Sequence, residues 1–235
     1  MRIAHVTATF PPHYSGTGMV CYYNAIGLAR LGHKVTVFTA DYPPCQPTYP
    51  KEIEVQRLRP WFRIGNAPLL PGLLQLEGFD LIHLHYPFYF GAELVFYRSR
   101  QSGLPYVLTY HQDVHFPGLL RFAEKLHYRL LGKRILTHAA KVLATSWDYA
   151  RASRLGELLQ AKPAAVDELP NGVDTECFHP AIDANELRKR YGLGADERVV
   201  LFVGALDRAH FFKGVAVLLQ AMAHVRDKHV RLLIV

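Results

Sequence analysis

Runs of apolar residues alternate with segments of helical periodicity along most of the chain. The first run, Ile3–Phe10, has the length of a buried strand, and Gly18–Leu31 places apolar residues near one face of a helix. A second apolar run, Lys34–Ala40, completes a strand–loop–helix–strand unit of about forty residues, which is typical of parallel strands joined by a crossover helix. This unit predicts an α/β domain.

The same alternation continues through the first three quarters of the chain. A Pro-rich loop at 42–50 separates the first unit from the remaining apolar runs. The pattern predicts a doubly wound parallel sheet, in which ligands bind just beyond the carboxyl ends of the strands. The further strands that we predict cover residues 53–58, 81–85, 106–111, 141–145 and 165–169.

The pattern begins again near residue 180. We expect an N-terminal Rossmann-like domain over residues 1–178, followed over 179–235 by a linker and the start of a second Rossmann-like domain. A strand–helix–strand piece of this size has too little core to fold alone, and it leaves an apolar sheet edge unpaired, so we expect the second domain to be truncated. Its predicted elements are a polar helix at 185–191, a buried strand at 198–204, a helix at 215–225 and a strand at 230–235.

Composition narrows the class of protein. Half of the 235 residues are hydrophobic and 20% are charged, which is typical of a globular chain. Cys21, Cys45 and Cys177 are odd in number and widely spaced, which favours reduced thiols over a disulfide framework or a CxxC metal site. No apolar run approaches the ~20 residues that span a bilayer, and the N-terminus lacks the pattern of a signal peptide. We expect a cytoplasmic protein.

The positive charge is concentrated in one segment. Residues 98–162 hold 11 Lys and Arg against 4 Asp and Glu, a net of 11 − 4 = +7, which equals the net charge of the whole chain. Within this segment a helix is expected over 119–134, with a basic stripe beside an apolar one. Such a helix either rests on an anionic membrane or packs on its own sheet with a solvated basic face. The basic stripe is Arg121, Lys125, Arg129 and Lys133, and the apolar stripe is Phe122, Leu126 and Leu130.

Nucleic acid is a weaker candidate for the anionic partner of residues 98–162. The aromatic residues Tyr97, Tyr128 and Trp147 do not form an evident stacking platform for bases.

Two loops that follow predicted strands carry candidate chemistry. Gly16, Thr17 and Gly18 open the first helix, where glycines let a ligand approach the backbone and the helix N-terminus offers free N–H groups to an anion. A tight turn would need the same glycines. His111 and Asp113 lie where the fifth strand ends, and a histidine there can donate to a sugar hydroxyl or to a departing phosphate.

His83 and His85 alternate along one strand, so their side chains share a face. With His111 and His115 they could be drawn as a metal cluster, but no carboxylate pair or cysteine completes the set. We therefore expect no metal site and interpret His83 as a core histidine.

The loop at 207–214 lies between a strand and a helix of the second domain. Arg208 and Lys213 beside a helix N-terminus suit a diphosphate, although a connecting loop also commonly carries solvated charges.

Several motifs then occur in a fixed order, and the chain resembles the retaining GT-B glycosyltransferases of glycosyltransferase family 4 over its whole length. The combination of PNGVD-x-x-x-F-x-P with a later VG…KG is the most specific part. The motifs are GTG at 16–18, LGHKVTV at 31–37, DLIHLH at 80–85, TYHQD at 109–113, ATS at 144–146, LPNGVD at 169–174, FHP at 178–180, FVG at 202–204 and KG at 213–214.

The resemblance implies a nucleotide-sugar donor such as a UDP- or GDP-sugar, with no other cofactor and no metal, and a glycan, lipid-linked or small-molecule acceptor. It implies that Gly16 to Gly18 line the donor diphosphate and sugar. It further implies that His111 contacts the transferred sugar, as the catalytic residue, and that Arg208 and Lys213 neutralise the diphosphate. The residues implied to line the cleft are His85, Asp113, Ser146, Asn171 and Gly172.

Three departures from the family pattern affect these implications. The usual Gly-Gly pair is Gly16-Thr17, and the arginine that usually follows the VG glycine is Ala205, for which Arg208 would substitute. The family's downstream glutamate pair would lie beyond Val235. The alternatives are a non-catalytic module that binds phosphate or glycan ligands, and a degenerate remnant of an enzyme.

Overall fold

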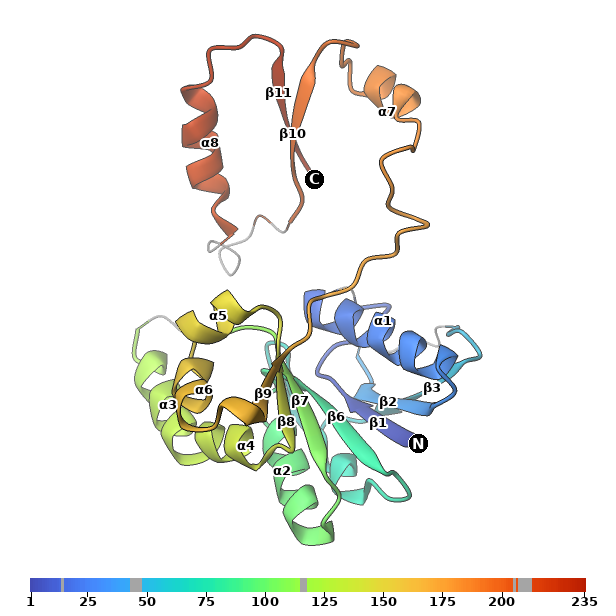
Figure 1. The fold of residues 1–235 in the computed structure, drawn as a ribbon, viewed down its shortest axis with the longest axis vertical. Helices are drawn as coiled ribbons and strands as arrows, with labels where there is room; N and C mark the ends of the chain where they lie inside the picture. The colour runs from blue at the N-terminus through green and yellow to red at the C-terminus, as the bar shows by residue number, and fades with distance from the viewer. Residues whose placement is uncertain (14, 43–47, 115–117, 205, 207–212) are drawn as a thin grey trace. The chain divides into compact units, whose positions relative to one another are not determined.

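The computed structural model describes residues 1–235 except 14, 43–47, 115–117, 205 and 207–212 (Figure 1). The chain divides into two compact units, Met1–Gly172 and Val173–Val235. The expected domain boundary at 178 falls just inside the second unit.

A parallel sheet of seven strands forms the centre of the first unit. The strand order is β3-β2-β1-β6-β7-β8-β9, and each neighbouring pair is parallel, so the predicted doubly wound sheet is confirmed. The strands are β1 (Arg2–Val6), β2 (Lys34–Ala40), β3 (Ile53–Leu58), β6 (Leu81–Tyr86), β7 (Tyr106–Tyr110), β8 (Lys141–Ala144) and β9 (Val166–Glu168).

Helix α1 (Gly16–Arg30) covers one face of the sheet at the β1–β3 end (Figure 1). The Ser15 hydroxyl caps its start by accepting a hydrogen bond from Gly18 N at 3.0 Å, and Gly32, with φ of 88°, follows its end. Cys21, Ala25 and Ile26 of the helix pack into an apolar cluster with residues of β2 and β3, so this half of the face is a conventional hydrophobic core.

The opposite face carries the larger core. Its centre consists of Ala4, Val6, Ile82 and Leu84 from β1 and β6, all fully buried. The helices and turns that contribute to this core are η1 (Pro71–Gln75), α2 (Gly91–Ser102), α4 (Lys133–His138), α5 (Trp147–Ala152) and α6 (Leu155–Ala161). A short turn, η3 (Pro163–Ala165), leads into β9.

Residues 119–134, where a basic helix was expected, are helical from Leu120. The apolar stripe of this helix faces solvent and not the sheet. The helix consists of α3 (Leu120–His127), a π-helical turn (Tyr128–Gly132) and α4. Glu124 and Tyr128 of this segment face inward. The Glu124 carboxylate accepts two hydrogen bonds from the Arg154 guanidinium, and the one from Nη2 measures 2.7 Å. The side chains of the apolar stripe, Phe122, Leu126 and Leu130, are more than half exposed. The interpretation in which this helix packs on the protein's own sheet is therefore wrong for this stripe.

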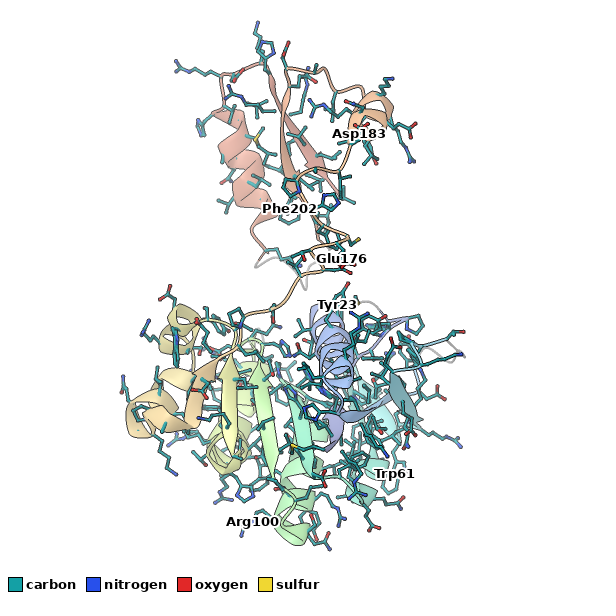
Figure 2. All side chains as sticks on the ribbon, turned by 45° about the vertical axis from the view of Figure 1, so that its right-hand side comes forward. Tyr23, Trp61, Arg100, Glu176, Asp183 and Phe202 are labelled. Carbon is teal, nitrogen blue, oxygen red and sulfur yellow. The ribbon has the colours of Figure 1, made fainter. Side chains whose placement is uncertain are left out.

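A small hairpin, which the apolar pattern did not predict, projects beside the sheet. Strands β4 (Phe62–Ile64) and β5 (Ala67–Leu69) are antiparallel, and Gly65 occupies the left-handed region that their tight turn needs. Trp61, just before the hairpin, is 78% exposed (Figure 2). Three-residue strands are too short for alternation to reveal them.

The second unit contains the parallel pair β10 (Arg198–Phe202) and β11 (Val230–Ile234), with α7 (Asn185–Arg190) and α8 (Val215–Ala223). The Arg188 guanidinium donates to the carbonyls of Gly194 and Glu197 and thereby holds α7 against the loop that follows it. The strand residues are half-buried or exposed, as expected for a sheet with two strands. Among the described residues, no helix combines the length and the apolar character needed to cross a membrane.

The ion pair between Glu124 and Arg154 gives a first prediction. In Glu124→Ala the guanidinium, which is 22% exposed, loses its partner, and the free energy of unfolding should fall by about 3 kcal/mol. Urea denaturation measures the loss. Asp148→Ala, which removes an exposed pair with Arg151, is the control and should change stability by less than about 0.5 kcal/mol. Equal effects of the two substitutions would contradict the prediction.

Candidate functional site

The strand order reverses between β1 and β6, and this reversal places the candidate site. From β1 the chain moves outward through α1 to β2, whereas from β6 it moves through α2 to β7 on the other side. The two connections leave over opposite faces, and in sheets of this kind ligands bind at the carboxyl ends of the strands beside such a reversal. The residues after β1, β6 and β7 therefore meet at one edge of the sheet.

The predicted glycine loop lies at this edge, and its two glycines have different environments. A Cβ on Gly18 would lie 2.7 Å from the carbonyl oxygen of Thr9, so close packing alone requires this glycine. A Cβ on Gly16 would meet no described atom within 4 Å, and Gly16 is exposed. Packing therefore does not explain why a glycine stands at position 16. The first turn of α1, which begins there, offers free backbone N–H groups. Thr17 is half-buried.

A row of imidazoles runs across the sheet towards this edge. His5 Nδ1 lies 3.1 Å from His85 Nε2, and His85 Nδ1 lies 3.0 Å from His111 Nε2. The His85 ring stacks on His111, with 5.3 Å between centroids. His83 stacks against His85 and contacts Thr109 Oγ1 at 2.7 Å. His111 is thus the partly exposed end of a buried hydrogen-bonded series.

These histidines are held neutral by their surroundings. Burial lowers the pKa of His111 to about 4, and burial followed by the charge of His111 lowers the pKa of His83 to about 4. Burial and then the neighbouring imidazoles lower the pKa of His5 and His85 well below the usual range. At neutral pH, His111 therefore interacts as a neutral ring with one N–H and one lone pair.

Asp113 and Ser146 have structural partners. The Tyr110 hydroxyl donates to Asp113 Oδ1, and the backbone N–H of Asp113 donates to the Tyr149 hydroxyl at 2.6 Å. Burial, followed by the hydrogen bond to Asp113, raises the pKa of Tyr110. Ser146 caps α5 by accepting from Tyr149 N at 3.1 Å. These contacts fix the loops beside His111, so both residues have a structural role there.

Lys213 belongs to the second unit, where it lies over Gly204. A Cβ on Gly204 would come within 3.4 Å of Lys213 Nζ, so the glycine leaves room for the ammonium group just before α8. Arg208 lies outside the described residues. Asn171 and Gly172, at the end of the first unit, are exposed.

Three residues could hold a metal ion by their donor chemistry. His5, Cys21 and His85 are buried, and one ligand atom from each lies within 4.8 Å of the others. This group differs from the set of His83, His85, His111 and His115 that was considered from the sequence and not expected to bind a metal, and His115 lies outside the described residues. A thiolate ligand is unfavourable here, because burial raises the Cys21 pKa well above its usual value.

Sequence reasoning missed His5 as a member of the imidazole row. The signal was its position: His5 lies inside the first strand, and β1 pairs with β6 so that His5 is opposite His83. This pairing places the two side chains on one face, but which strands are neighbours was not evident from the chain order.

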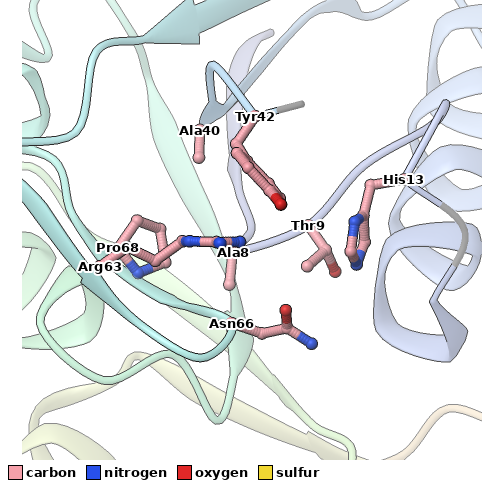
Figure 3. Close-up of a pocket in the computed structure, with 8 residues that line it drawn as sticks. All are labelled: Ala8, Thr9, His13, Ala40, Tyr42, Arg63, Asn66 and Pro68. Atoms are coloured by element: carbon pink, nitrogen blue, oxygen red, sulfur yellow. The ribbon is translucent and has the colours of Figure 1, made fainter. Parts of the chain in front are cut away.

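A small hollow beside β1 was also not predicted (Figure 3). Arg63 of the hairpin lies in its wall, with its guanidinium carbon 3.5 Å from the centre of the Tyr42 ring. The hollow is lined by Ala8, Thr9, His13, Ala40, Tyr42, Arg63, Asn66 and Pro68.

Comparison with known proteins places this arrangement in a family. The family model of Glycosyltransferase Family 4 matches residues 14–177. A D-inositol 3-phosphate glycosyltransferase from Thermobispora bispora is 31% identical over 236 residues, covering 88% of this chain and 54% of the relative. The chain spans about half the length of such curated relatives.

Two solved structures show the same fold. HepE from Anabaena, in complex with UDP, matches with a TM-score of 0.69 at 18% identity. The match covers all of this chain and 60% of the HepE chain. The catalytic domain of starch synthase IV from Arabidopsis thaliana, bound to ADP and acarbose, has a TM-score of 0.73 at 16% identity, with 100% and 68% coverage. This likeness confirms the fold class.

The neutral histidines predict a dependence of stability on pH. Since a histidine with a lowered pKa binds a proton more readily in the unfolded chain, the free energy of unfolding should fall as the pH drops from about 6.5 towards about 4. Each such residue contributes up to about 1.4 kcal/mol per pH unit. Urea denaturation between pH 5 and 7 measures the slope. The slope should shrink in His83→Val and persist in a control at exposed His138, His138→Ala; a flat profile in the unaltered chain would exclude the effect.

Proposed function

Since this chain belongs to glycosyltransferase family 4, we propose that its protein transfers a hexose-like sugar from a nucleoside-diphosphate sugar, such as a UDP- or GDP-sugar, to an acceptor with retention of configuration. The observation that carries the proposal is the arrangement at one sheet edge. There a neutral, partly exposed His111 shares the switch point with the open Gly16 at the start of α1.

The charges suit cleavage of a bond between sugar and phosphate. Negative charge develops on the departing diphosphate, and positive charge develops on the anomeric carbon. In our proposal Lys213 and the N-terminus of α8 stabilise the diphosphate within the second unit, with Arg208 as a further cation, and no metal is needed. Gly16 lets the donor approach the N–H groups of α1.

His111 is proposed to contact the transferred sugar. Because its pKa is held at about 4, it remains neutral and can donate or accept one hydrogen bond at the sugar. We propose that the leaving phosphate accepts the proton of the acceptor hydroxyl on the same face of the sugar, so that no strong protein base takes part. His85, Asp113, Ser146, Asn171 and Gly172 are proposed to support or line the site within the first unit.

The acceptor is proposed to bind to the first unit, at the hollow beside β1. Arg63, His13 and Asn66 give this surface hydrogen-bond donors and a cation, which suit a hydroxylated acceptor that carries an anionic group. The Thermobispora bispora relative is a D-inositol 3-phosphate glycosyltransferase, and inositol phosphate is a compound of this chemical class. A glycan, a lipid-linked or a small-molecule acceptor would each meet these requirements.

Donor binding gives a third prediction. In the protein that carries this chain, Lys213→Ala should weaken the binding of UDP-glucose or GDP-mannose, whichever is the better ligand, about ten- to a hundredfold, because a charge-assisted contact contributes roughly 1.5–3 kcal/mol. Isothermal titration calorimetry measures the affinity, and Lys228→Ala, at an exposed lysine of the same unit, is the control. We expect the 235-residue chain alone to bind weakly and to turn over slowly; steady transfer by it at ordinary enzyme rates would contradict this.

The release of free sugar separates an enzyme from a binding module. Slow release of sugar from the donor, lost in His111→Ala, is expected of a transferase. Tight donor binding with no sugar release or transfer to any acceptor would instead support a non-catalytic module.

We further propose that the protein is cytoplasmic and that it contacts an anionic membrane peripherally through residues 119–134. Phe122 and Leu126 are 60% and 58% exposed on α3, beside the exposed cations Arg121 and Lys125. A helix with this arrangement binds through buried apolar area and through attraction to anionic lipids.

Flotation with liposomes tests the membrane contact. The triple variant Arg121→Glu, Lys125→Glu, Arg129→Glu should no longer float with vesicles of phosphatidylglycerol and phosphatidylcholine, because each cation near the surface contributes about 1 kcal/mol. The control reverses three exposed cations elsewhere, Lys51, Arg226 and Lys228, and should float as the unaltered protein does. Equal flotation of both variants would refute the proposal.

A further inference from the structure

We propose that His5 and His85 are positioning residues that fix the tautomer of His111, so that His111 carries its hydrogen on Nδ1 and presents an N–H donor to the ligand. The inference rests on the proposed function only for the identity of the ligand. The hydrogen-bond geometry within the first unit carries the assignment itself.

The row of rings allows two consistent proton arrangements. Each neutral imidazole has one N–H and one lone pair, so neighbouring rings must donate in the same direction along the row. In the outward arrangement, His5 Nδ1–H donates to His85 Nε2, and His85 Nδ1–H donates to His111 Nε2. The His111 hydrogen is then on Nδ1. In the inward arrangement every bond reverses, and His111 Nδ1 carries a lone pair instead.

The buried end of the row decides between the two. His5 Nε2 is buried and has no hydrogen-bond partner among the described residues. In the outward arrangement this atom is an unpaired lone pair, whereas in the inward arrangement it is an unpaired N–H. Among backbone groups, buried N–H donors without a partner are rarer than buried acceptors without one, and we apply the same ordering to the ring nitrogen. The outward arrangement is therefore favoured.

Cys21 supports the same direction. Its sulfur lies 3.8 Å from His5 Nδ1, the atom that also contacts His85 Nε2. With hydrogen on Nδ1, His5 donates to His85 and the sulfur lies beside that hydrogen as a weak acceptor. With a lone pair on Nδ1, the thiol and the His85 N–H would compete for one acceptor site.

The proton arrangement of the row determines which nitrogen of His111, at its exposed end, carries the hydrogen. His111 Nε2 is occupied by His85, and Nδ1 has no partner within the part of the chain that the structure describes. The ring is stacked on His85 with planes 16° apart, so its orientation is fixed as well. His111 is thus preset as a neutral donor, suited to a sugar hydroxyl oxygen or a phosphate oxygen, before any ligand arrives.

Nitrogen-15 NMR of histidine-labelled protein tests the inference without any donor present. Free histidine in water favours hydrogen on Nε2, so the expected Nδ1–H form of His111 at pH 7.5 differs from that of an unconstrained loop histidine. Assignment comes from the loss of signals in His111→Ala. Observation of His111 mainly as the Nε2–H tautomer in the unaltered protein would overturn the proposal, and the variant His111→Ala serves only to assign the signals.

Two substitutions at one position separate the tautomer from packing. His85→Phe keeps a ring without a nitrogen, so His111 should revert to Nε2–H. His85→Asn places an amide N–H near the former Nδ1, so His111 should stay in the Nδ1–H form. Sugar release should fall about three- to tenfold in kcat in the Phe variant, with KM nearly unchanged and rescue by Asn, since a neutral hydrogen bond contributes roughly 0.5–1.5 kcal/mol. Equal tautomers in both variants would overturn the proposal.

Metal binding is the competing outcome. A zinc ion on His5, Cys21 and His85 would occupy His5 Nδ1 and His85 Nε2 and remove their hydrogen bond. Retention of one equivalent of zinc by the purified protein, lost in Cys21→Ala, would therefore overturn the inference. The expected tautomer in a protein that binds no nucleotide sugar would leave this inference intact and refute the proposed function.

Discussion

Burial of polar rings is the constraint on which the rest of the candidate site depends. His5, His83 and His85 are within 5% of full burial, and in such surroundings an unpaired imidazole nitrogen is costly. The strands must therefore keep a register that brings these rings into contact with one another and with Thr109. The same register carries β6 and β7 to a common edge, where the row ends at His111. A requirement of the core thus determines the geometry at the surface.

One face of the sheet carries the larger hydrophobic core, and the other face carries the row of histidines. Apolar side chains of β1 and β6 point to one face, where Val6, Ile82 and Leu84 are completely buried in the larger core. The alternate residues of the same two strands point to the face of α1, and three of them are histidines. Because side chains alternate along a strand, one pair of strands supplies both a hydrophobic centre and a polar row. Loss of either set would disturb the other only through the shared backbone.

Much of the fold was predictable from the sequence, because long apolar runs and helical periodicity report burial directly. The expected bounds of β2 and β3 agree with the structure at both ends, and the apolar run over 106–111 placed His111 at the end of its strand, one residue past the observed end of β7 at Tyr110. Contacts between distant segments were not predictable: His5 meets His85 across 80 positions of sequence. The inward orientation of Glu124 was also not predictable from the sequence. A carboxylate is buried only where a partner is present, and its partner Arg154 lies 30 positions away in the sequence.

The ion pair that anchors α3 has a consequence for how this surface can diverge. Since Glu124 and Tyr128 attach the helix from within, the side chains on its outer face contribute little to the core. Substitutions there can accumulate at small cost to folding, and each one changes what the surface adheres to. Related chains could thus differ in what this surface binds while they retain the same interior. The outer face of this helix can therefore change in sequence while the ion pair between Glu124 and Arg154 still holds the helix in place.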